Sequence, residues 1–190
     1  MTLPLFLTWL RIAAIPVLVL VFLFAPFDAA RPLSAWIFGL ASATDFLDGY
    51  LARRWNQQTS FGAFLDPVAD KLIVAAALIL LVHANGDILV VLAAIVIIGR
   101  EIFVSALREW MAESGNRAAV AVSQIGKLKT VAQMFALLFM LQWFPLWGVV
   151  PVYQMGYWLL MAAAGLTLLS GGLYGLAAWR AVNARRHSGA

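Results

Sequence analysis

Four aspartates gather in one short stretch of the sequence, residues 45–70. Asp45 and Asp48 are three positions apart, and Asp66 and Asp70 are four positions apart. Because residues at these spacings lie on one face of an α-helix, each pair would project from one side of its own helix. Two such helices facing each other would hold the four carboxylates around one small volume.

Four carboxylates packed this closely repel one another, so they must either take up protons or bind cations. Carboxylate oxygens are the ligands that Mg²⁺, Mn²⁺ and Ca²⁺ prefer, whereas zinc usually binds histidine or cysteine. The sequence contains no cysteine and only two histidines, His83 and His187. The aspartate cluster therefore predicts a site for hard divalent cations.

The residues around the aspartates suit a ligand that carries phosphate. Gly49, Ala52 and Gly62 are small enough to let such a ligand, or a neighbouring backbone, approach the acidic cluster closely. Arg53 follows Gly49 by about one helical turn, and its planar guanidinium is suited to binding a phosphate group. The stretch therefore predicts a metal site that also handles phosphate.

Together these residues form a motif, which reads Asp-x-x-Asp-Gly-x-x-Ala-Arg, eight further residues, then Gly-x-x-x-Asp-x-x-x-Asp. The motif resembles the signature of the CDP-alcohol phosphotransferases and matches all eight of its fixed positions at the family's spacing. The resemblance implies that Asp45, Asp48 and Asp66 bind two divalent ions, Mg²⁺ or Mn²⁺. It also implies that Asp70 is both a metal ligand and the catalytic base, the alternative being a ligand only.

The resemblance further implies a reaction and a nucleotide site. In this family an alcohol attacks the lipid-linked phosphorus of a CDP-activated lipid, and CMP leaves. Two metal ions about 4 Å apart would neutralise the pyrophosphate and stabilise an in-line displacement. Gly49, Ala52 and Arg53 would line the site for the cytidine diphosphate, and Thr59 stands where related enzymes contact the nucleotide.

A second region bears on which alcohol accepts the phosphatidyl group. Residues 100–113 and 125–130 resemble the bacterial phosphatidylglycerophosphate synthases, and basic side chains there would attract an anionic acceptor such as glycerol 3-phosphate. The residues expected to bind its phosphate are Arg100, Arg108, Lys127 and Lys129. Each of them has an alternative role as a cation that anchors the protein at the membrane surface. Glu101 is expected to pair with one of the arginines.

Two further features have no assigned role. Lys71 directly follows Asp70 but is also suited to be a surface lysine whose ammonium reaches the membrane interface. The resemblance also covers residues 3–11, in which Thr8 and Arg11 match but the family's usual asparagine beside the proline is absent. No function is therefore assigned to an amide side chain near the N-terminus.

The overall composition places the chain in a membrane. The 190 residues are 64% hydrophobic and only 12% charged, whereas roughly a quarter of the residues in soluble domains are charged. Apolar runs of about 20 residues, the length that spans a bilayer, recur along the whole chain rather than forming a single anchor. We therefore expect one all-α integral membrane domain over residues 1–190, with no separate soluble module.

The apolar runs predict six transmembrane helices. Their expected bounds are residues 5–26, 34–53, 64–83, 88–110, 127–143 and 153–178. For the first run the alternative is a cleaved signal peptide, but Phe27-Asp28-Ala29-Ala30 is a poor cleavage site. The second and third helices would run antiparallel and carry the two halves of the motif, with all four aspartates near one membrane face.

The basic residues predict how the helices are oriented. All lysines and arginines except Arg31 fall at one end of the predicted helices, together with the aspartates. By the positive-inside rule, both termini and the acidic site are cytoplasmic, and the resemblance to bacterial enzymes implies the inner membrane. The net charge of +4 is spread along the chain, so anionic lipids and substrates are expected partners rather than nucleic acid. The resemblance also implies a homodimer.

Three functions are compared on these grounds. The first is transfer of the phosphatidyl group of CDP-diacylglycerol to glycerol 3-phosphate, giving phosphatidylglycerophosphate and CMP. The second is the same chemistry with another acceptor, such as serine, inositol phosphate or phosphatidylglycerol. The third is a divalent-cation transporter, which predicts acidic residues spread through the bilayer depth, whereas the motif aspartates cluster at one face. We therefore expect the first function.

Overall fold

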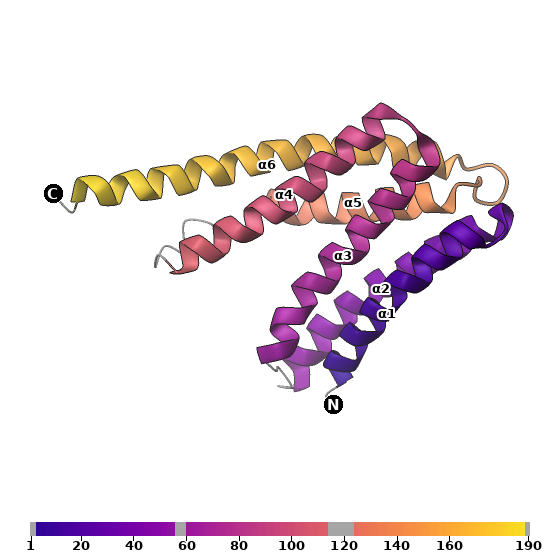
Figure 1. Cartoon of the computed structure of the whole chain (residues 1–190), viewed down its shortest axis with the longest axis horizontal. Helices are drawn as coiled ribbons and strands as arrows, with labels where there is room; N and C mark the ends of the chain where they lie inside the picture. Colours follow the sequence, from indigo (N-terminus) through magenta and orange to yellow (C-terminus); the bar gives the residue numbers. More distant parts are fainter. Residues whose placement is uncertain (1–2, 56–59, 114–123, 189–190) are drawn as a thin grey trace.

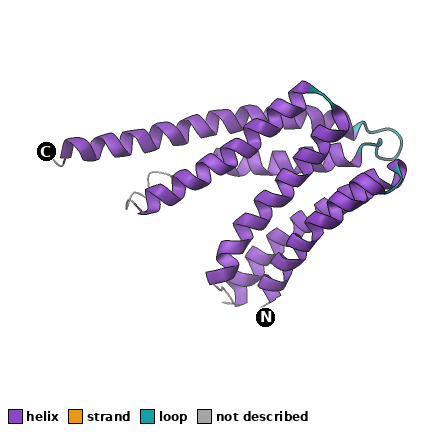
Figure 2. Ribbon diagram, in the orientation of Figure 1, coloured by secondary structure: helices purple, strands orange, loops and turns teal. Residues whose placement is uncertain are grey.

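The computed structural model describes residues 3–55, 60–113 and 124–188, and its regular structure there is helical apart from an isolated β-bridge between Leu146 and Val150 (Figure 1). The helices are α1 (Leu3–Phe24), α2 (Phe27–Trp55), α3 (Ser60–Asn85), α4 (Ile88–Glu113), α5 (Gln124–Gln142) and α6 (Val152–Ser188). Figure 2 shows that, among the described residues, loops form the connections from α1 to α2, from α3 to α4 and from α5 to α6. The expected all-α fold is confirmed.

The six helices fall into two groups that diverge from each other (Figure 1). In the first group α1 packs against both α2 and α3, and in the second α6 packs against both α4 and α5. The groups are joined where α2 and α3 contact α5, and where α3 contacts α4. Both chain termini lie at the diverging ends, away from the loop between α5 and α6 (Figure 1).

One apolar core joins the two groups. Its fully buried members include Leu18, Phe38, Leu78, Ile97, Leu137 and Leu160, one from each helix in turn. Large apolar side chains also cover the outer surface, where Trp36, Ile79 and Trp158 are 66%, 60% and 69% exposed. Soluble proteins rarely expose so much apolar surface, so this surface is suited to lipid.

Three helical segments in the described residues are long and apolar enough to cross a membrane, namely Leu5–Phe24, Ile88–Glu113 and Val152–Leu176. Lys129–Gln142 is apolar over a shorter length. These segments identify a membrane protein and account for three of the six predicted spans.

Two helices, α2 and α6, extend farthest beyond their expected bounds. α2 begins at Phe27 rather than at residue 34, because the chain reverses at Pro26, whose carbonyl accepts the first helical hydrogen bonds. Arg31 is therefore buried within this helix instead of lying in a loop. α6 ends at Ser188, beyond the expected residue 178, so the basic tail continues the helix.

The helices α5 and α6 approach each other closely at Gly156, which is buried. A Cβ atom at this position would lie 2.8 Å from the carbonyl oxygen of Ala136 and 2.9 Å from the backbone nitrogen of Met140. Both neighbours are backbone atoms that cannot rotate away. The absence of a side chain at Gly156 therefore allows the two backbones to touch.

Aromatic side chains close the end of the molecule away from the motif. The Arg31 guanidinium lies over the rings of Phe22, Phe27 and Trp143, at 4.0, 4.8 and 4.9 Å from their centroids. Trp143 also packs against Tyr153, with 4.6 Å between the ring centroids. These contacts hold the start of α2 against the loop that leads from α5 into α6.

Hydrogen bonds between helices strengthen the same end. Tyr153 donates to the side-chain carbonyl of Asn85, and Tyr157 donates to the Asp87 carboxylate at 2.9 Å. Asp87 also accepts a hydrogen bond from the Leu89 amide at 2.8 Å, so it caps the N-terminus of α4. The turn between α3 and α4 is thereby held against the first turns of α6.

Candidate active site

The two halves of the aspartate motif lie on consecutive helices, as their spacing predicted. The last turns of α2 carry Asp45, Asp48, Gly49, Ala52 and Arg53, whose side chains lie outside the described part of the structure, as does all of Thr59. Asp66 and Asp70 follow in the first half of α3, and their side chains are described. The end of α2 and the start of α3 lie next to the beginning of α1 (Figure 1).

Both described aspartates are bound by side chains of α1. Thr8 donates a hydrogen bond from Oγ1 to Asp66 Oδ1 at 2.5 Å, and Arg11 Nη1 lies 2.5 Å from Asp70 Oδ1. Arg11 Nε also donates to the Ala41 carbonyl at 3.3 Å. The sequence assigned Thr8 and Arg11 no role, although a charged residue inside an apolar helix is itself a signal of function.

A cavity of about 530 Å³ opens beside Asp70, between α2, α3, α4 and α5. Asp70, Lys71 and Glu101 bring charge to its lining. The rest of the lining is mostly apolar and includes Phe38, Val74, Ile97, Met134, Phe135 and Leu138. The Asp70 side chain is 34% exposed, so its carboxylate is accessible even though Arg11 holds one of its oxygens.

Lys71 makes an interhelical contact at the wall of this cavity. Its Nζ donates to Ser105 Oγ at 2.5 Å, and Ser105 Oγ donates in turn to the Glu101 backbone carbonyl at 2.7 Å. Lys71 therefore links α3 to α4 next to Asp70, rather than extending to the membrane interface. The sequence could not indicate this pairing, because the two partners are 34 residues apart on different helices.

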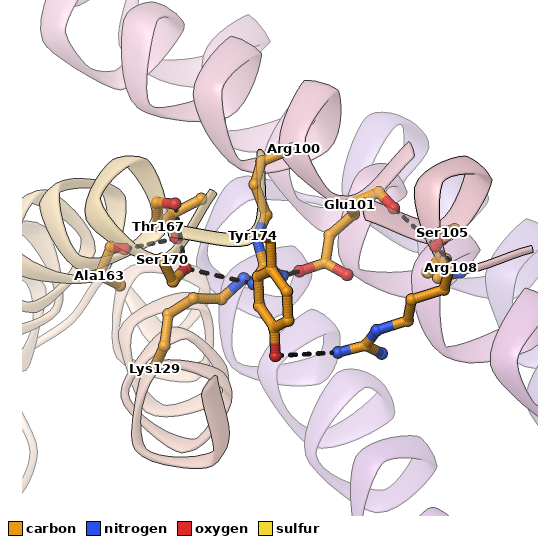
Figure 3. A network of polar contacts seen from close by, with 10 residues as sticks. Arg100, Glu101, Ser105, Arg108, Lys129, Ala163, Thr167, Ser170 and Tyr174 are labelled. Atoms are coloured by element: carbon orange, nitrogen blue, oxygen red, sulfur yellow. Dashed lines mark hydrogen bonds and ion pairs between the residues drawn. The ribbon is translucent and has the colours of Figure 1, made fainter. Parts of the chain in front are cut away.

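Glu101 is the centre of a charged network on α4 (Figure 3). Its Oε1 lies 3.0 Å from Arg100 Nη1 and 2.6 Å from Lys129 Nζ. The expected pairing of Glu101 with an arginine is thus confirmed, and Lys129 is a second partner. Because Lys129 is fully buried, its charge must be balanced inside the protein, and the Glu101 carboxylate does so.

Two arginines of α4 are held by side chains of α6 (Figure 3). Arg100 Nη2 donates to Ser170 Oγ, and Arg108 Nη2 donates to the Tyr174 hydroxyl, both at 3.2 Å. Both guanidinium groups also lie near the Tyr174 ring, at 5.5 and 5.3 Å from its centroid. The sequence did not single out Ser170 and Tyr174, because nothing distinguishes them from other residues of an apolar helix.

The structure brings together three of the four residues expected to bind the acceptor phosphate. Arg100, Arg108 and Lys129 gather where α4, α5 and α6 meet (Figure 3). In the described residues, the Nε atoms of Arg100 and Arg108 are buried and have no hydrogen-bond partner. Lys127 lies in the first turn of α5, and its side chain is outside the described part.

Asp66 and Asp70 are chemically suited to a hard divalent cation, because carboxylate oxygens are the ligands that Mg²⁺ and Mn²⁺ prefer. In the described part of the chain, no three Asp, Glu, His or Cys side chains come together as a metal site. Asp45 and Asp48, the other two predicted ligands, have side chains outside that part. The described residues therefore include two of the four predicted metal ligands, and the chemistry of these two carboxylates suits a hard divalent cation.

The chain is similar to proteins of a known family. The sequence profile of the CDP-alcohol phosphatidyltransferases matches residues 1–169. A protein of Salmonella choleraesuis (strain SC-B67) is 54% identical over 168 residues, which are 88% of this chain and 89% of that protein. A protein of Shigella flexneri serotype 5b (strain 8401) is 52% identical with the same coverage. A protein of Pectobacterium atrosepticum is 56% identical over 75% of this chain and 77% of that protein.

All three relatives are named CDP-diacylglycerol–glycerol-3-phosphate 3-phosphatidyltransferase. No solved structure matches the chain. The family profile and the relatives extend far beyond residues 45–70, so the likeness is not confined to the motif. The chain therefore belongs to the CDP-alcohol phosphatidyltransferase family.

Proposed function

We infer that this chain transfers the phosphatidyl group of CDP-diacylglycerol to glycerol 3-phosphate, giving phosphatidylglycerophosphate and CMP. Relatives that are 52% and 54% identical over most of the chain carry the name of this reaction. In the structure, the inference rests on the position of Asp70. This motif carboxylate lines a cavity of about 530 Å³ with mostly apolar walls, which suits a lipid that ends in a reactive phosphate.

The CDP-lipid would lie with its acyl chains against the apolar walls and its headgroup beside the motif. The residues proposed to bind the cytidine diphosphate are Gly49, Ala52, Arg53 and Thr59. Their match to the family motif supports this role, and so does the position of α2, whose last turns lie beside the start of α3 (Figure 1). Small residues there would let the phosphates approach the helix backbone.

The residues proposed to hold divalent ions are Asp45, Asp48, Asp66 and Asp70. Two such ions, Mg²⁺ or Mn²⁺, would neutralise the negative charge of the pyrophosphate when bound. The chemistry of the two described carboxylates supports this assignment, because both offer oxygen ligands at the start of α3.

Asp70 is proposed to be the base as well as a ligand. Its carboxylate would take the proton of the acceptor's hydroxyl group while the hydroxyl oxygen forms a bond to the lipid-linked phosphorus. The bond from that phosphorus to the CMP oxygen breaks, and CMP leaves with the electron pair. The accessibility of Asp70 at the cavity wall supports this role, since a base must reach the proton that it removes.

The acceptor phosphate is proposed to bind at Arg100, Arg108, Lys127 and Lys129. The buried, unpaired Nε atoms of Arg100 and Arg108 support an anion there, because a buried donor without an acceptor is costly. Lys129 is tied to Glu101 through one N–H, and the other two N–H groups of its ammonium would be the donors that it offers to the phosphate. Ser170 and Tyr174 would hold the two arginines in place.

The chain is proposed to form one domain that crosses the bacterial inner membrane six times. Both termini and the active site would face the cytoplasm, and the protein would be a homodimer. The location of both termini at the diverging ends of the helices supports the shared side (Figure 1). Arg31 near the aromatic end supports the same orientation, because the sequence predicts every other lysine and arginine at the motif end of the helices.

The decisive experiment measures CMP release by the purified chain in detergent with CDP-diacylglycerol and Mg²⁺. Glycerol 3-phosphate, serine, inositol phosphate and phosphatidylglycerol are compared as acceptors, and Asp66→Ala is the blank. We expect release with glycerol 3-phosphate alone, lost in Asp66→Ala. Release with a different acceptor would overturn the proposed acceptor pocket, and no release with any acceptor would overturn the proposed reaction.

A further inference from the structure

Two polar side chains of α1 reach across to the predicted metal ligands of α3. Thr8 and Arg11 are each only 1% exposed, in a helix that is otherwise apolar. Burying a guanidinium in such a place is unfavourable unless it finds charged or polar partners. The partners that both residues find are carboxylates of the motif, Asp66 and Asp70.

The spacing of the residues along each helix allows two contacts to form side by side. Thr8 and Arg11 are three positions apart on α1, and Asp66 and Asp70 are four positions apart on α3, so each pair lies on one helix face. Both helices begin at the same end of the molecule (Figure 1). Each α1 side chain therefore meets its own aspartate, at 2.5 Å in both cases.

Arg11 is itself fixed in position by a second helix. Its Nε donates to the Ala41 carbonyl of α2 at 3.3 Å, one helical turn before Asp45. The guanidinium therefore connects α1 to both helices that carry the motif. The Asp70 carboxylate therefore lies against a guanidinium that a second contact holds in place.

We propose that Thr8 and Arg11 are positioning residues that set the Asp66 and Asp70 carboxylates for divalent-cation binding before any substrate arrives. Hydrogen-bond partners of metal-binding carboxylates orient them, and losing such a partner typically weakens metal binding about 10- to 100-fold. Arg11 also offsets part of the repulsion between the clustered carboxylates. This proposal rests on the metal site proposed above.

A purely structural role predicts something different. If Arg11 only ties α1 to the bundle, its loss lowers stability without changing the affinity of the folded protein for metal. If Arg11 instead competes with the metal for Asp70, its loss tightens metal binding. Metal affinity measured without substrate therefore separates the three roles.

The test measures Mn²⁺ binding to the full chain in detergent, with the electron paramagnetic resonance signal of free Mn²⁺ reporting the unbound ion. Asp66→Ala is the variant that is expected to lose the site. We expect Arg11→Gln to weaken binding about 10- to 100-fold and Arg11→Lys to recover part of the loss. Arg31→Gln is the matched control, because it removes a second buried arginine far from the motif, and we expect it to keep wild-type affinity. Unchanged or tighter binding by Arg11→Gln, or an equal loss in Arg31→Gln, would overturn the proposal.

Thr8 keeps the proposal testable if Arg11→Gln fails to fold. Thr8→Val preserves shape but removes the hydroxyl donor, so we expect about twofold to tenfold weaker Mn²⁺ binding. Thr8→Ser retains the donor and should bind Mn²⁺ as the wild type does. Equal affinities of the two variants would contradict the proposal.

The same variants in the CMP-release assay distinguish this proposal from the proposed function. If the wild type releases no CMP with any acceptor while the Mn²⁺ affinities follow the expected order, the reaction is wrong and the positioning role stands. If the wild type is active while Arg11→Gln and Thr8→Val bind Mn²⁺ normally, the reaction stands and the positioning role is wrong.

Discussion

Arg11 and Arg31 are both buried, but Arg11 lies at the motif end of the α1–α2 pair and Arg31 lies at the opposite end. The protein stabilises the two charges in different ways. Arg11 is 1% exposed and binds the Asp70 carboxylate and a backbone carbonyl. Arg31 is 7% exposed and lies over three aromatic rings, while its Nε and Nη1 have no hydrogen-bond partner in the described residues. One cation is balanced by charge, and the other by ring quadrupoles.

The two arginines therefore distinguish the motif end, where the reaction is proposed to occur, from the opposite end, where contacts hold the helices together. At the motif end, polar groups are paired with the carboxylates that are proposed to bind metal, Asp66 and Asp70. At the other end, aromatic packing and the bonds from Tyr153 and Tyr157 hold the connecting turns. The arginines of α4 combine the two modes, because each has a polar partner and also lies near the Tyr174 ring.

The largest expected effect comes from replacing an aspartate at the motif end, with an aspartate at the other end as the control. Asp70→Asn removes the proposed base, and general-base catalysis typically contributes about 10²- to 10⁴-fold, so we expect kcat for CMP release to fall by that factor. Binding of CDP-diacylglycerol should remain. Asp87→Asn is the control, because Asp87 caps α4 and binds Tyr157 at the end away from the motif. Retained turnover in Asp70→Asn would remove the base assignment.

Replacing each of the two arginines with methionine tests whether they contribute differently to the free energy of unfolding. Arg11→Met leaves the Asp70 carboxylate without its cation, and because Asp70 is 34% exposed we expect a loss near the lower end of the about 3–5 kcal/mol in unfolding free energy that breaking a buried ion pair costs. Arg31→Met loses ring contacts but also removes a buried charge, so we expect a change below about 2 kcal/mol. Unfolding of both variants in detergent measures the difference. Equal losses of unfolding free energy in the two variants would contradict the difference between the two ends.

A smaller effect is expected from the tyrosine that meets two arginines. Tyr174→Phe keeps the ring beside Arg100 and Arg108 but removes the hydroxyl that accepts from Arg108. One hydrogen bond is worth about 1 kcal/mol, so we expect KM for glycerol 3-phosphate to rise about fivefold, with KM for CDP-diacylglycerol unchanged. Tyr174→Leu, which also removes the ring, should raise it further. Equal effects on both substrates would count against the acceptor pocket.

The sequence predicted what depends on spacing along one helix. The positions of the motif halves on α2 and α3 follow from aspartates spaced three or four positions apart, and the Glu101–Arg100 pair joins adjacent residues. The membrane location follows from composition alone. These features require no knowledge of which helices are neighbours.

Features that depend on packing between helices could not be predicted in the same way. Thr8 and Asp66 are 58 positions apart, and Arg108 and Tyr174 are 66 apart, so only the assembled bundle brings them together. The early start of α2 was missed for a related reason. Arg31 indicates a loop if it must face water, but rings from α1 and from the loop after α5 cover it.

The contact at Gly156 gives α6 the mechanics of a lever. Because the backbones of α5 and α6 approach most closely where Gly156 lacks a side chain, a tilt of α6 would pivot about this point. Tyr174 lies 18 residues further along the same helix, which is about 27 Å at 1.5 Å per residue. A tilt of about 2° at this point would displace Tyr174 by about 1 Å, so a small rotation of α6 at Gly156 would become a larger displacement beside the arginines of α4.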